Sequence, residues 1–143
     1  MSTTEKLNGY GPLAGVKVVE LCEWVAAPAC VRCLSEMGAT VIKVEPPYGD
    51  AQRTQGPGFG CEQTDMEDPT IDLNNTNKNF VSINLKNEEG MKFMKKLLAD
   101  ADIFVNNLRD KALNKMGLDY ETLHKEFPTL IWAQMRGYGE YGP

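Results

Sequence analysis

The sequence predicts an α/β fold in which a parallel sheet carries helices on both faces. Short apolar runs typical of buried strands alternate along the chain with segments that repeat apolar residues at helical spacing. Of the 143 residues, 42% are hydrophobic and 24% are charged, which is ordinary globular composition and argues against disorder. A chain of this length buries about two thirds of its unfolded surface, so one domain, or a large piece of one, is expected.

A strand–helix–strand unit opens the predicted fold. Residues 16–21 and 40–45 are short runs rich in apolar and β-branched residues, which indicates strands. Between them, Pro28 suits the first helical turn and Gly38 the position after the last one. The apolar residues that share one face of this helix are Val31, Leu34 and Met37. Two strands joined by a helix in this way are parallel, with a right-handed crossover.

Residues 46–70 interrupt the alternation with a segment rich in proline and glycine. A loop of this length is uncommon and is usually functional, partner-covering or mobile, and a plain surface connection fits the sequence equally well. Asp65, Glu67 and Asp68 form an acidic cluster within it, which we interpret as a solvated charged loop.

Strands and helices alternate again in the second half of the chain. The predicted strands are 80–85, 103–105 and 130–134, and the predicted helices are the one after Asn87, 111–116 and 120–126. Asn87 is a suitable N-cap, and the acidic residues that follow it favour the positive end of a helix dipole. The apolar stripe of this helix consists of Met91, Met94, Leu98 and Ala101, widened by Phe93 and Leu97.

Charge and hydropathy exclude several classes of function. The 20 Asp and Glu outnumber the 15 Lys and Arg, giving a net charge of −5, so a basic stripe for nucleic acid is not expected. No apolar run approaches the roughly 18 residues of a membrane-spanning helix, and the polar N-terminal residues 1–6 do not lead into a signal-peptide core. We therefore expect a cytoplasmic protein with reduced thiols and without nucleic-acid or membrane partners.

The four cysteines and the single histidine do not form a metal or redox motif. Cys30 and Cys33 have C-x-x-C spacing, but they fall inside the predicted helix rather than at its N-terminus, where redox-active thiols usually lie. No second C-x-x-C is present, and His124 lies on a polar helix face, so neither a zinc site nor a histidine base is predicted. We expect Cys22, Cys30 and Cys33 to be thiols buried in the core.

The carboxyl ends of the predicted strands gather small, amide-bearing and basic residues. Ligands of open α/β sheets bind at this edge, and Lys86, Arg109 and Lys115 would supply positive charge for a phosphate-bearing, nucleotide-like ligand. Lys and Arg are also common on solvent-facing loops. Glu45 stands near the position of a ribose-binding acid, but the first βα turn, EWVAAPA, lacks G-x-G-x-x-G, which argues against nicotinamide dinucleotide.

Several sequence blocks resemble, in their order and spacing, those of class III CoA-transferases, the family of formyl-CoA and carnitine-CoA transferases. The blocks are GPLAGVKVVEL (11–21), GATVIKVEP (38–46), NK (77–78), INLK (83–86), ADIFVNN (101–107), MGLDY (116–120) and GYGEYGP (137–143). They occur in this order along nearly the whole chain. The segments that most resemble the branch transferring CoA among 2-hydroxy acids, such as phenyllactate and 2-hydroxyisocaproate, are 26–29, 107–113 and 118–123.

The resemblance implies a Rossmann-like large domain from an interlocked homodimer, with residues 1–143 as its N-terminal segment and therefore an incomplete domain. Coenzyme A would lie across the strand ends while it passes between an acyl-CoA and a carboxylic acid through an aspartyl anhydride. The residues that match CoA-contacting positions are Val25, Ala26, Ile83, Asn84, Leu85, Lys86, Asn107, Leu108, Arg109 and Lys115. Pro46 replaces a CoA-binding arginine of formyl-CoA transferase, and Arg53 is a candidate substitute.

The resemblance places the catalytic aspartate of the family beyond Pro143. No residue of this chain is therefore assigned a catalytic role, no metal is implied, and we expect no transferase turnover from the chain alone. An α-methylacyl-CoA racemase, which shares the fold, and a non-catalytic CoA-binding module are the alternatives. Because the sheet of the family would be incomplete at this point, we also expect apolar side chains to be exposed at strand edges.

Overall fold

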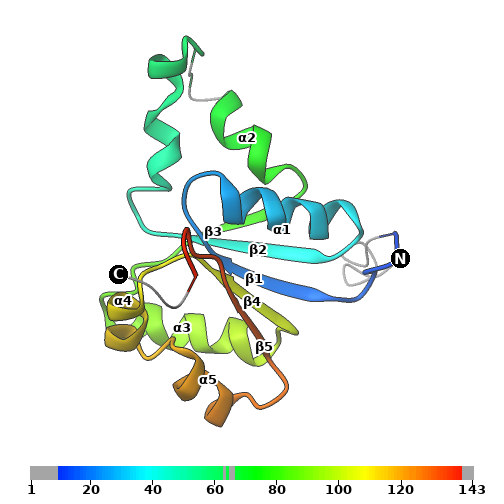
Figure 1. The fold of residues 1–143 in the computed structure, drawn as a ribbon, viewed down its shortest axis with the longest axis vertical. Coiled ribbons are helices and arrows are strands. Elements are labelled where there is room, and N and C mark those ends of the chain that lie inside the picture. Colours follow the sequence, from blue (N-terminus) through cyan, green and yellow to red (C-terminus); the bar gives the residue numbers. More distant parts are fainter. Residues whose placement is uncertain (1–9, 63, 65–66, 140–143) are drawn as a thin grey trace.

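The computed structural model describes residues 10–62, 64 and 67–139, and within them five strands form a parallel sheet between two layers of helices (Figure 1). The strands are β1 (Lys17–Leu21), β2 (Thr40–Glu45), β3 (Asn79–Ser82), β4 (Ile103–Asn106) and β5 (Ile131–Gln134). Their order across the sheet is β3-β2-β1-β4-β5, and every neighbouring pair is parallel. The predicted α/β class is confirmed. The strand order reverses between β1 and β4, which creates a topological switch point there.

Helices cover both faces of the sheet. They are α1 (Ala26–Glu36), α2 (Pro69–Asn75), α3 (Glu88–Ala99), α4 (Asp110–Met116) and α5 (Tyr120–Glu126). α1 lies over one face, while α3, α4 and α5 lie over the other (Figure 1). Because successive strand residues point to opposite faces, Val18 packs in the core beneath α1 and Val19 in the core shared with α3 to α5.

The long helix α3 begins as its sequence predicts. The Asn87 side chain accepts a hydrogen bond from the Gly90 N–H at 2.7 Å, so Asn87 is the N-cap. Met94 and Leu98 are fully buried against the sheet. Phe93, which was expected to widen the apolar stripe, is instead 47% exposed. The buried stripe of α3 is therefore narrower than predicted.

Two element boundaries differ from the prediction for reasons that involve proline. α1 begins at Ala26, so Pro28 lies within its first turn, where a missing N–H leaves no helical bond unmade. β3 ends at Ser82 rather than continuing to residue 85. The Ile83 N–H donates the last ladder bond to the Glu45 carbonyl at 2.8 Å, and the next donor of this chain toward β3 would be residue 47, which is Pro47 and has no N–H.

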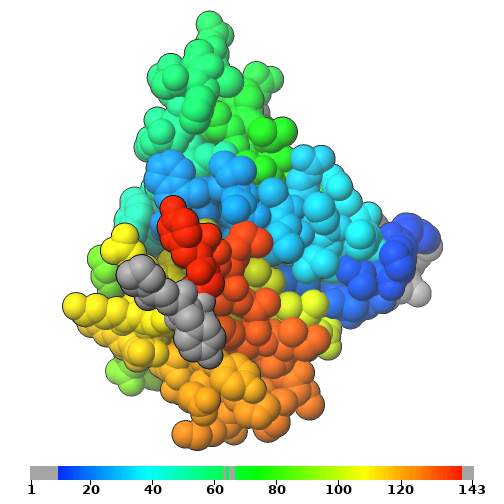
Figure 2. All heavy atoms as spheres, viewed as in Figure 1, coloured from blue at the N-terminus to red at the C-terminus, as the bar shows by residue number. Residues whose placement is uncertain are grey.

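Residues 46–62, 64 and 67–75 form an arm that stands away from the sheet above α1 (Figure 2). The arm contains two 3₁₀ helices, Ala51–Thr54 and Gly56–Phe59, and the helix α2, none of which the sequence predicted. Asp68 accepts the Ile71 N–H and caps α2, so it is a capping residue and not part of a solvated acidic cluster. Asp65 lies outside the described residues.

The cysteines of α1 are not in the core. Cys22 is buried as expected, but Cys30 and Cys33 are exposed, and all four cysteines of the chain are free. The buried residues of α1 include Ala27 and Val31. A helix turns by about 100° per residue, so Cys33 falls on the side opposite Val31, and the expectation of buried thiols there is wrong.

Both edge strands expose an apolar side chain, as expected for this stretch of sheet. Phe80 of β3 is 45% exposed, and Ile131 of β5 is 60% exposed. None of the helices among residues 10–62, 64 and 67–139 has both the length and the apolar character needed to cross a bilayer.

The contrast between two adjacent residues of α3 makes a test of this packing. We expect Met94→Ala to lower the free energy of unfolding by about 2–5 kcal/mol, because it leaves a cavity under the helix. Phe93→Ala removes a larger side chain but should cost less than about 1 kcal/mol, since half of that ring is already solvated. Urea unfolding followed by circular dichroism measures both, and an equal or larger loss for Phe93→Ala would contradict the packing described.

Candidate functional site

A cavity of about 310 Å³ opens at the carboxyl ends of β1 to β4. It is lined by Leu21, Cys22, Glu23, Val44, Pro46, Pro47, Tyr48, Ile83, Asn84, Leu85, Lys86, Leu108 and Met116. This is the edge at which open α/β sheets bind ligands. A larger hollow runs along the outer face of α3, but it is lined by residues of that single helix, most of them charged, and lies away from the strand ends.

Half of the residues predicted to contact CoA line this cavity, namely Ile83, Asn84, Leu85, Lys86 and Leu108. The other half, Val25, Ala26, Asn107, Arg109 and Lys115, follow β1 and β4 but lie outside the cavity lining. Their contact with CoA stays a prediction. Arg53, the candidate substitute for a CoA-binding arginine, also lies outside it.

The β3–α3 loop is held tightly against the first turn of α3. The Asn84 side chain accepts a hydrogen bond from the Lys86 N–H at 3.0 Å, which closes a small turn. Gly90 lies so close that a Cβ built on it would stand 2.1 Å from the Asn84 carbonyl oxygen. A side chain at position 90 would therefore displace the part of the loop that lines the cavity.

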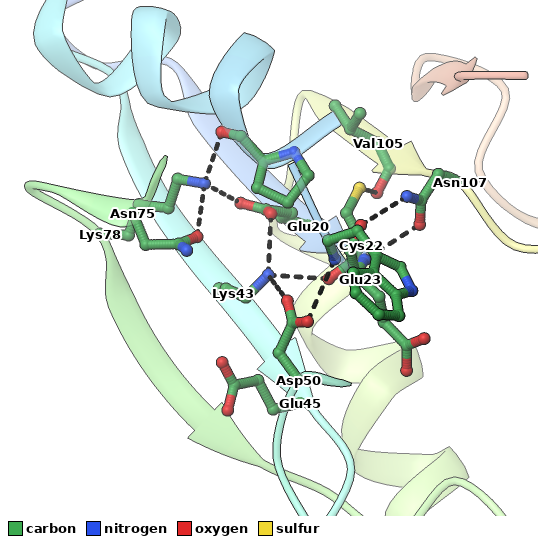
Figure 3. Close-up of polar contacts among 12 residues, drawn as sticks. Glu20, Cys22, Glu23, Lys43, Glu45, Asp50, Asn75, Lys78, Val105 and Asn107 are labelled. Atoms are coloured by element: carbon green, nitrogen blue, oxygen red, sulfur yellow. Dashed lines mark hydrogen bonds and ion pairs between the residues drawn. The ribbon is translucent and has the colours of Figure 1, made fainter. Parts of the chain in front are cut away.

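A network of buried charged side chains lies on the α1 face of the sheet, and the sequence analysis did not predict it. It consists of Glu20, Lys43, Asp50 and Lys78, whose side chains are fully buried (Figure 3). The Lys43 ammonium lies 3.2 Å from Glu20 and 3.0 Å from Asp50, and the Lys78 ammonium lies 2.7 Å from Glu20. Two positive and two negative charges thus balance within the network.

The sheet register explains how the network forms. Glu20 of β1 is directly opposite Lys43 of β2, so the two side chains share the α1 face of the sheet. Lys78 also donates to the Pro28 carbonyl at 2.8 Å and to Asn75 Oδ1 at 2.9 Å, which ties the end of the arm to α1. The available signal was a charged residue inside each of two apolar strand runs, KVVEL and TVIKVE.

Burial and pairing act against each other on these charges. Burial raises the pKa of the Glu20 carboxyl, although Lys43 and Lys78 oppose the rise. Burial also lowers the pKa of Lys78 despite its contact with Glu20. For Lys43, burial acts to lower the pKa, but Glu20 and Asp50 together outweigh it and the pKa is raised. Lys43 is therefore the cation that the surrounding carboxylates stabilise best.

The turn after β1 carries an acidic side chain into the cavity. The Glu23 N–H donates to Asn107 Oδ1 at 3.0 Å, and Asn107 Nδ2 donates to the Glu23 carbonyl at 2.7 Å (Figure 3). Burial raises the pKa of the Glu23 carboxyl, and the charge of Asp50 adds to the rise while Lys43 opposes it. The cavity lining thus includes one acid, Glu23, and one base, Lys86.

Other candidate side chains are engaged in structural contacts. The Arg53 guanidinium binds both oxygens of the Glu45 carboxylate, at 2.9 and 3.0 Å, and lies 5.4 Å from the Phe80 ring centroid. His124 is exposed and stacks on Tyr120 with ring centroids 5.2 Å apart. Among the described residues, no three His, Cys, Asp or Glu side chains cluster as metal ligands would.

A parallel sheet with a switch point and a cavity at its strand ends is typical of α/β proteins that bind a ligand at this edge. A family model described as CoA-transferase family III matches residues 13–143. The chain therefore belongs to CoA-transferase family III, and the resemblance noted in the sequence is confirmed.

Two curated relatives are similar over nearly the whole chain. It is 50% identical over 131 residues to (R)-2-hydroxy-4-methylpentanoate CoA-transferase of Clostridioides difficile, covering 92% of this chain and 33% of the relative. It is 48% identical over 136 residues to cinnamoyl-CoA:phenyllactate CoA-transferase of Clostridium sporogenes, covering 95% and 33%. The chain thus spans about a third of the length of these relatives.

Solved structures agree with the fold. A CAIB/BAIF family protein from Brucella suis superposes with a TM-score of 0.85 at 38% identity, covering 93% of this chain and 35% of that chain. Rv3272 of Mycobacterium tuberculosis superposes with a TM-score of 0.80 at 32% identity, covering 95% and 36%.

The contact between Gly90 and the Asn84 carbonyl can be tested with a matched pair of variants. We expect Gly90→Ala to lower the free energy of unfolding by about 1–3 kcal/mol, because the added methyl group overlaps backbone that cannot move freely. Gly58→Ala is the control, since a Cβ there meets nothing within 4 Å. It should leave stability unchanged or raise it by up to about 1 kcal/mol. Chemical denaturation measures the free energy of unfolding of both variants. Equal values would show that the β3–α3 loop can move to accommodate the methyl group without loss of stability.

Proposed function

We propose that this chain forms part of the CoA site of an enzyme that transfers CoA between an acyl-CoA and a 2-hydroxy acid. The observation that carries the proposal is the strand-end cavity, lined by residues 83–86, within a chain that belongs to CoA-transferase family III. The cavity and the positions that the family resemblance implies for CoA contact include the same residues, Ile83 to Lys86 and Leu108.

The gradient of similarity supports a 2-hydroxy acid as the acceptor. Relatives named for 2-hydroxy-4-methylpentanoate and phenyllactate, both 2-hydroxy acids, are 50% and 48% identical. Identity falls to 40% for the human succinyl-CoA:glutarate CoA-transferase and to 34% for formyl-CoA:oxalate CoA-transferase of Escherichia coli. The two relatives near 50% identity are thus both named for 2-hydroxy acids, whereas the relatives at 40% and below are mixed and include one named for L-malate, also a 2-hydroxy acid, at 39%.

The cavity combines the two kinds of surface that CoA requires. Leu21, Val44 and Ile83 form an apolar wall suited to the less polar parts of the ligand. Lys86, which is exposed at the end of the β3–α3 loop, is placed to meet a phosphate group. Arg109 and Lys115, exposed near the two ends of α4, would add positive charge around the same edge.

In the whole enzyme, transfer would proceed through an aspartate that the family supplies outside residues 1–143. Its carboxylate would attack the thioester, forming a mixed anhydride and releasing the CoA thiolate. The carboxylate of the incoming acid would attack the aspartyl carbonyl and displace the first acid as its carboxylate, which forms a second mixed anhydride. The CoA thiolate would then attack the acyl carbonyl of the incoming acid, forming the new acyl-CoA and releasing the aspartate carboxylate. The homodimer implied by the family belongs to the same proposal.

Calorimetric titration with CoA tests this proposal directly. We expect the chain to bind CoA and to show no exchange when cinnamoyl-CoA and phenyllactate are supplied together. Absence of CoA binding would contradict the proposed site. Turnover by the chain alone would contradict the assignment of the aspartate to another part of the protein, and epimerisation of a 2-methylacyl-CoA would favour the racemase alternative.

The charge of Lys86 should contribute directly to CoA affinity. We expect Lys86→Gln to raise the Kd for CoA roughly tenfold, since one charge-assisted contact with a phosphate is lost. Lys96→Gln removes the same charge from α3 outside the cavity lining and should leave the Kd unchanged. Equal effects of the two substitutions would mean that only the net charge of the chain matters.

The acid in the cavity should make CoA binding depend on pH. Because the pKa of Glu23 is raised, protonation removes its negative charge at a higher pH than for an ordinary glutamate. We expect Glu23→Gln to tighten CoA binding about fivefold at pH 8, the effect of relieving roughly 1 kcal/mol of repulsion. The advantage should vanish as the pH falls through the raised pKa, where wild-type Glu23 is also neutral.

The Kd values of the wild type and of Glu23→Gln are compared at the same pH, so that the titration of CoA affects both equally. Glu121→Gln, on α5 and outside the cavity lining, is the matched control and should track the wild type throughout. An advantage of Glu23→Gln that stays constant down to pH 4.5 would contradict a titrating Glu23.

A further inference from the structure

The turn that links β1 to α1 is held almost entirely by side chains from other elements. We define the β1–α1 turn as residues 22–25. The Cys22 carbonyl accepts from Lys43 Nζ at 2.7 Å, and the Trp24 N–H donates to Asp50 Oδ1 at 3.1 Å. The Asn107 side chain binds the N–H and the carbonyl of Glu23 between them. Four consecutive backbone groups thus depend on three side chains, from β2, the arm and the segment after β4.

The conformation of the turn needs this support. Trp24 has a φ of +67°, in the left-handed region that residues other than glycine rarely adopt. Its side chain is about half exposed, so packing of the ring contributes little to holding the backbone there. Such strained conformations persist where surrounding contacts determine them, and they concentrate at binding sites.

Asp50 is placed so that only a carboxylate satisfies all its neighbours. It is 1% exposed. One oxygen accepts from the Trp24 and Gln52 N–H groups, at 3.1 and 2.9 Å, and the other lies 3.0 Å from the Lys43 ammonium. An amide in the same place would turn its NH₂ group either toward the ammonium or toward the two N–H donors. An acceptor oxygen is therefore required on both sides, and the side that faces Lys43 also requires the negative charge.

We infer that Asp50 is a positioning residue that fixes the β1–α1 turn, and with it the β1 side of the CoA site, through its bond to the Trp24 N–H. The turn contributes Cys22 and Glu23 to the cavity lining, ends with Val25 and leads into Ala26. Asp50 acts through the turn, from outside that lining. The consequence for CoA rests on the proposed function, whereas the consequence for the turn does not.

Asp50→Asn and Glu20→Gln make a matched pair for the test. Each replaces one carboxylate of the buried charge network by its amide, and each carboxylate is paired on both oxygens. Among the described residues, the recorded partners of the Glu20 side chain are Lys43 and Lys78, outside the turn. The two variants therefore share the loss of charge and differ in contact with the turn.

Amide hydrogen exchange measured by NMR reports how firmly the β1–α1 turn is held, and it needs no ligand. We expect the Trp24 amide to exchange roughly tenfold faster in Asp50→Asn than in the wild type, while amides within β1 and β2 stay protected. Glu20→Gln should leave the Trp24 amide as slow as in the wild type. In the same proteins, the Kd for CoA should rise roughly tenfold in Asp50→Asn and much less in Glu20→Gln.

A double variant covers the case in which Asp50→Asn does not fold. Lys43→Met with Asp50→Leu removes one charge of each sign and leaves Glu20 paired with Lys78, so the remaining network is balanced. The double variant should fold, its Trp24 amide should exchange faster than in the wild type, and it should bind CoA weakly. A Trp24 amide as slow as in the wild type would overturn the inference, as would unchanged CoA affinity in a protein whose turn has been released. If the wild type does not bind CoA, the proposed function fails while the amide exchange still decides the role of Asp50.

Discussion

The contact on which the structure depends is the buried pair of Glu20 and Lys43 at the centre of the sheet. Charges in an apolar core are costly unless each finds partners, and removing one partner leaves the other uncompensated. The chain meets this constraint with Asp50, near the start of the arm, and Lys78, three residues after its end. The course of the arm over α1 is thus determined at both ends by the charges on β1 and β2.

The same constraint links the core to the candidate site. Asp50 and Lys43 satisfy one another and also the backbone of the turn that follows β1, so a single set of contacts pairs the buried charges and shapes one side of the cavity. On the opposite side, Gly90 allows the β3–α3 loop to lie against α3. The cavity therefore stands between two backbone segments whose positions the core determines.

Local patterns predicted much of this fold, because strands and helices follow from hydrophobic periodicity and capping. α5 and β4 lie within one residue of their predicted bounds, and Asn87 caps α3 as expected. The buried charge network escaped prediction because its members come from segments distant in sequence. α2 and the exposure of Cys33 were missed although local signals existed, namely Asp68 before Pro69 and the turn of about 200° between Val31 and Cys33. The family resemblance named ten CoA-contacting positions, but only the folded sheet shows that residues 83–86 and Leu108 line one cavity.

The strand order also has a consequence for how the chain folds. The two halves of the sheet, β3-β2-β1 and β4-β5, are joined through the β1–β4 ladder, in which Val18 is opposite Ile103. During synthesis, β1 can pair with β2 early, but its other edge stays open until β4 has emerged. The centre of the sheet is consequently completed only when residues 103–106 have been made, and until then a nascent chain must shield the open edge of β1.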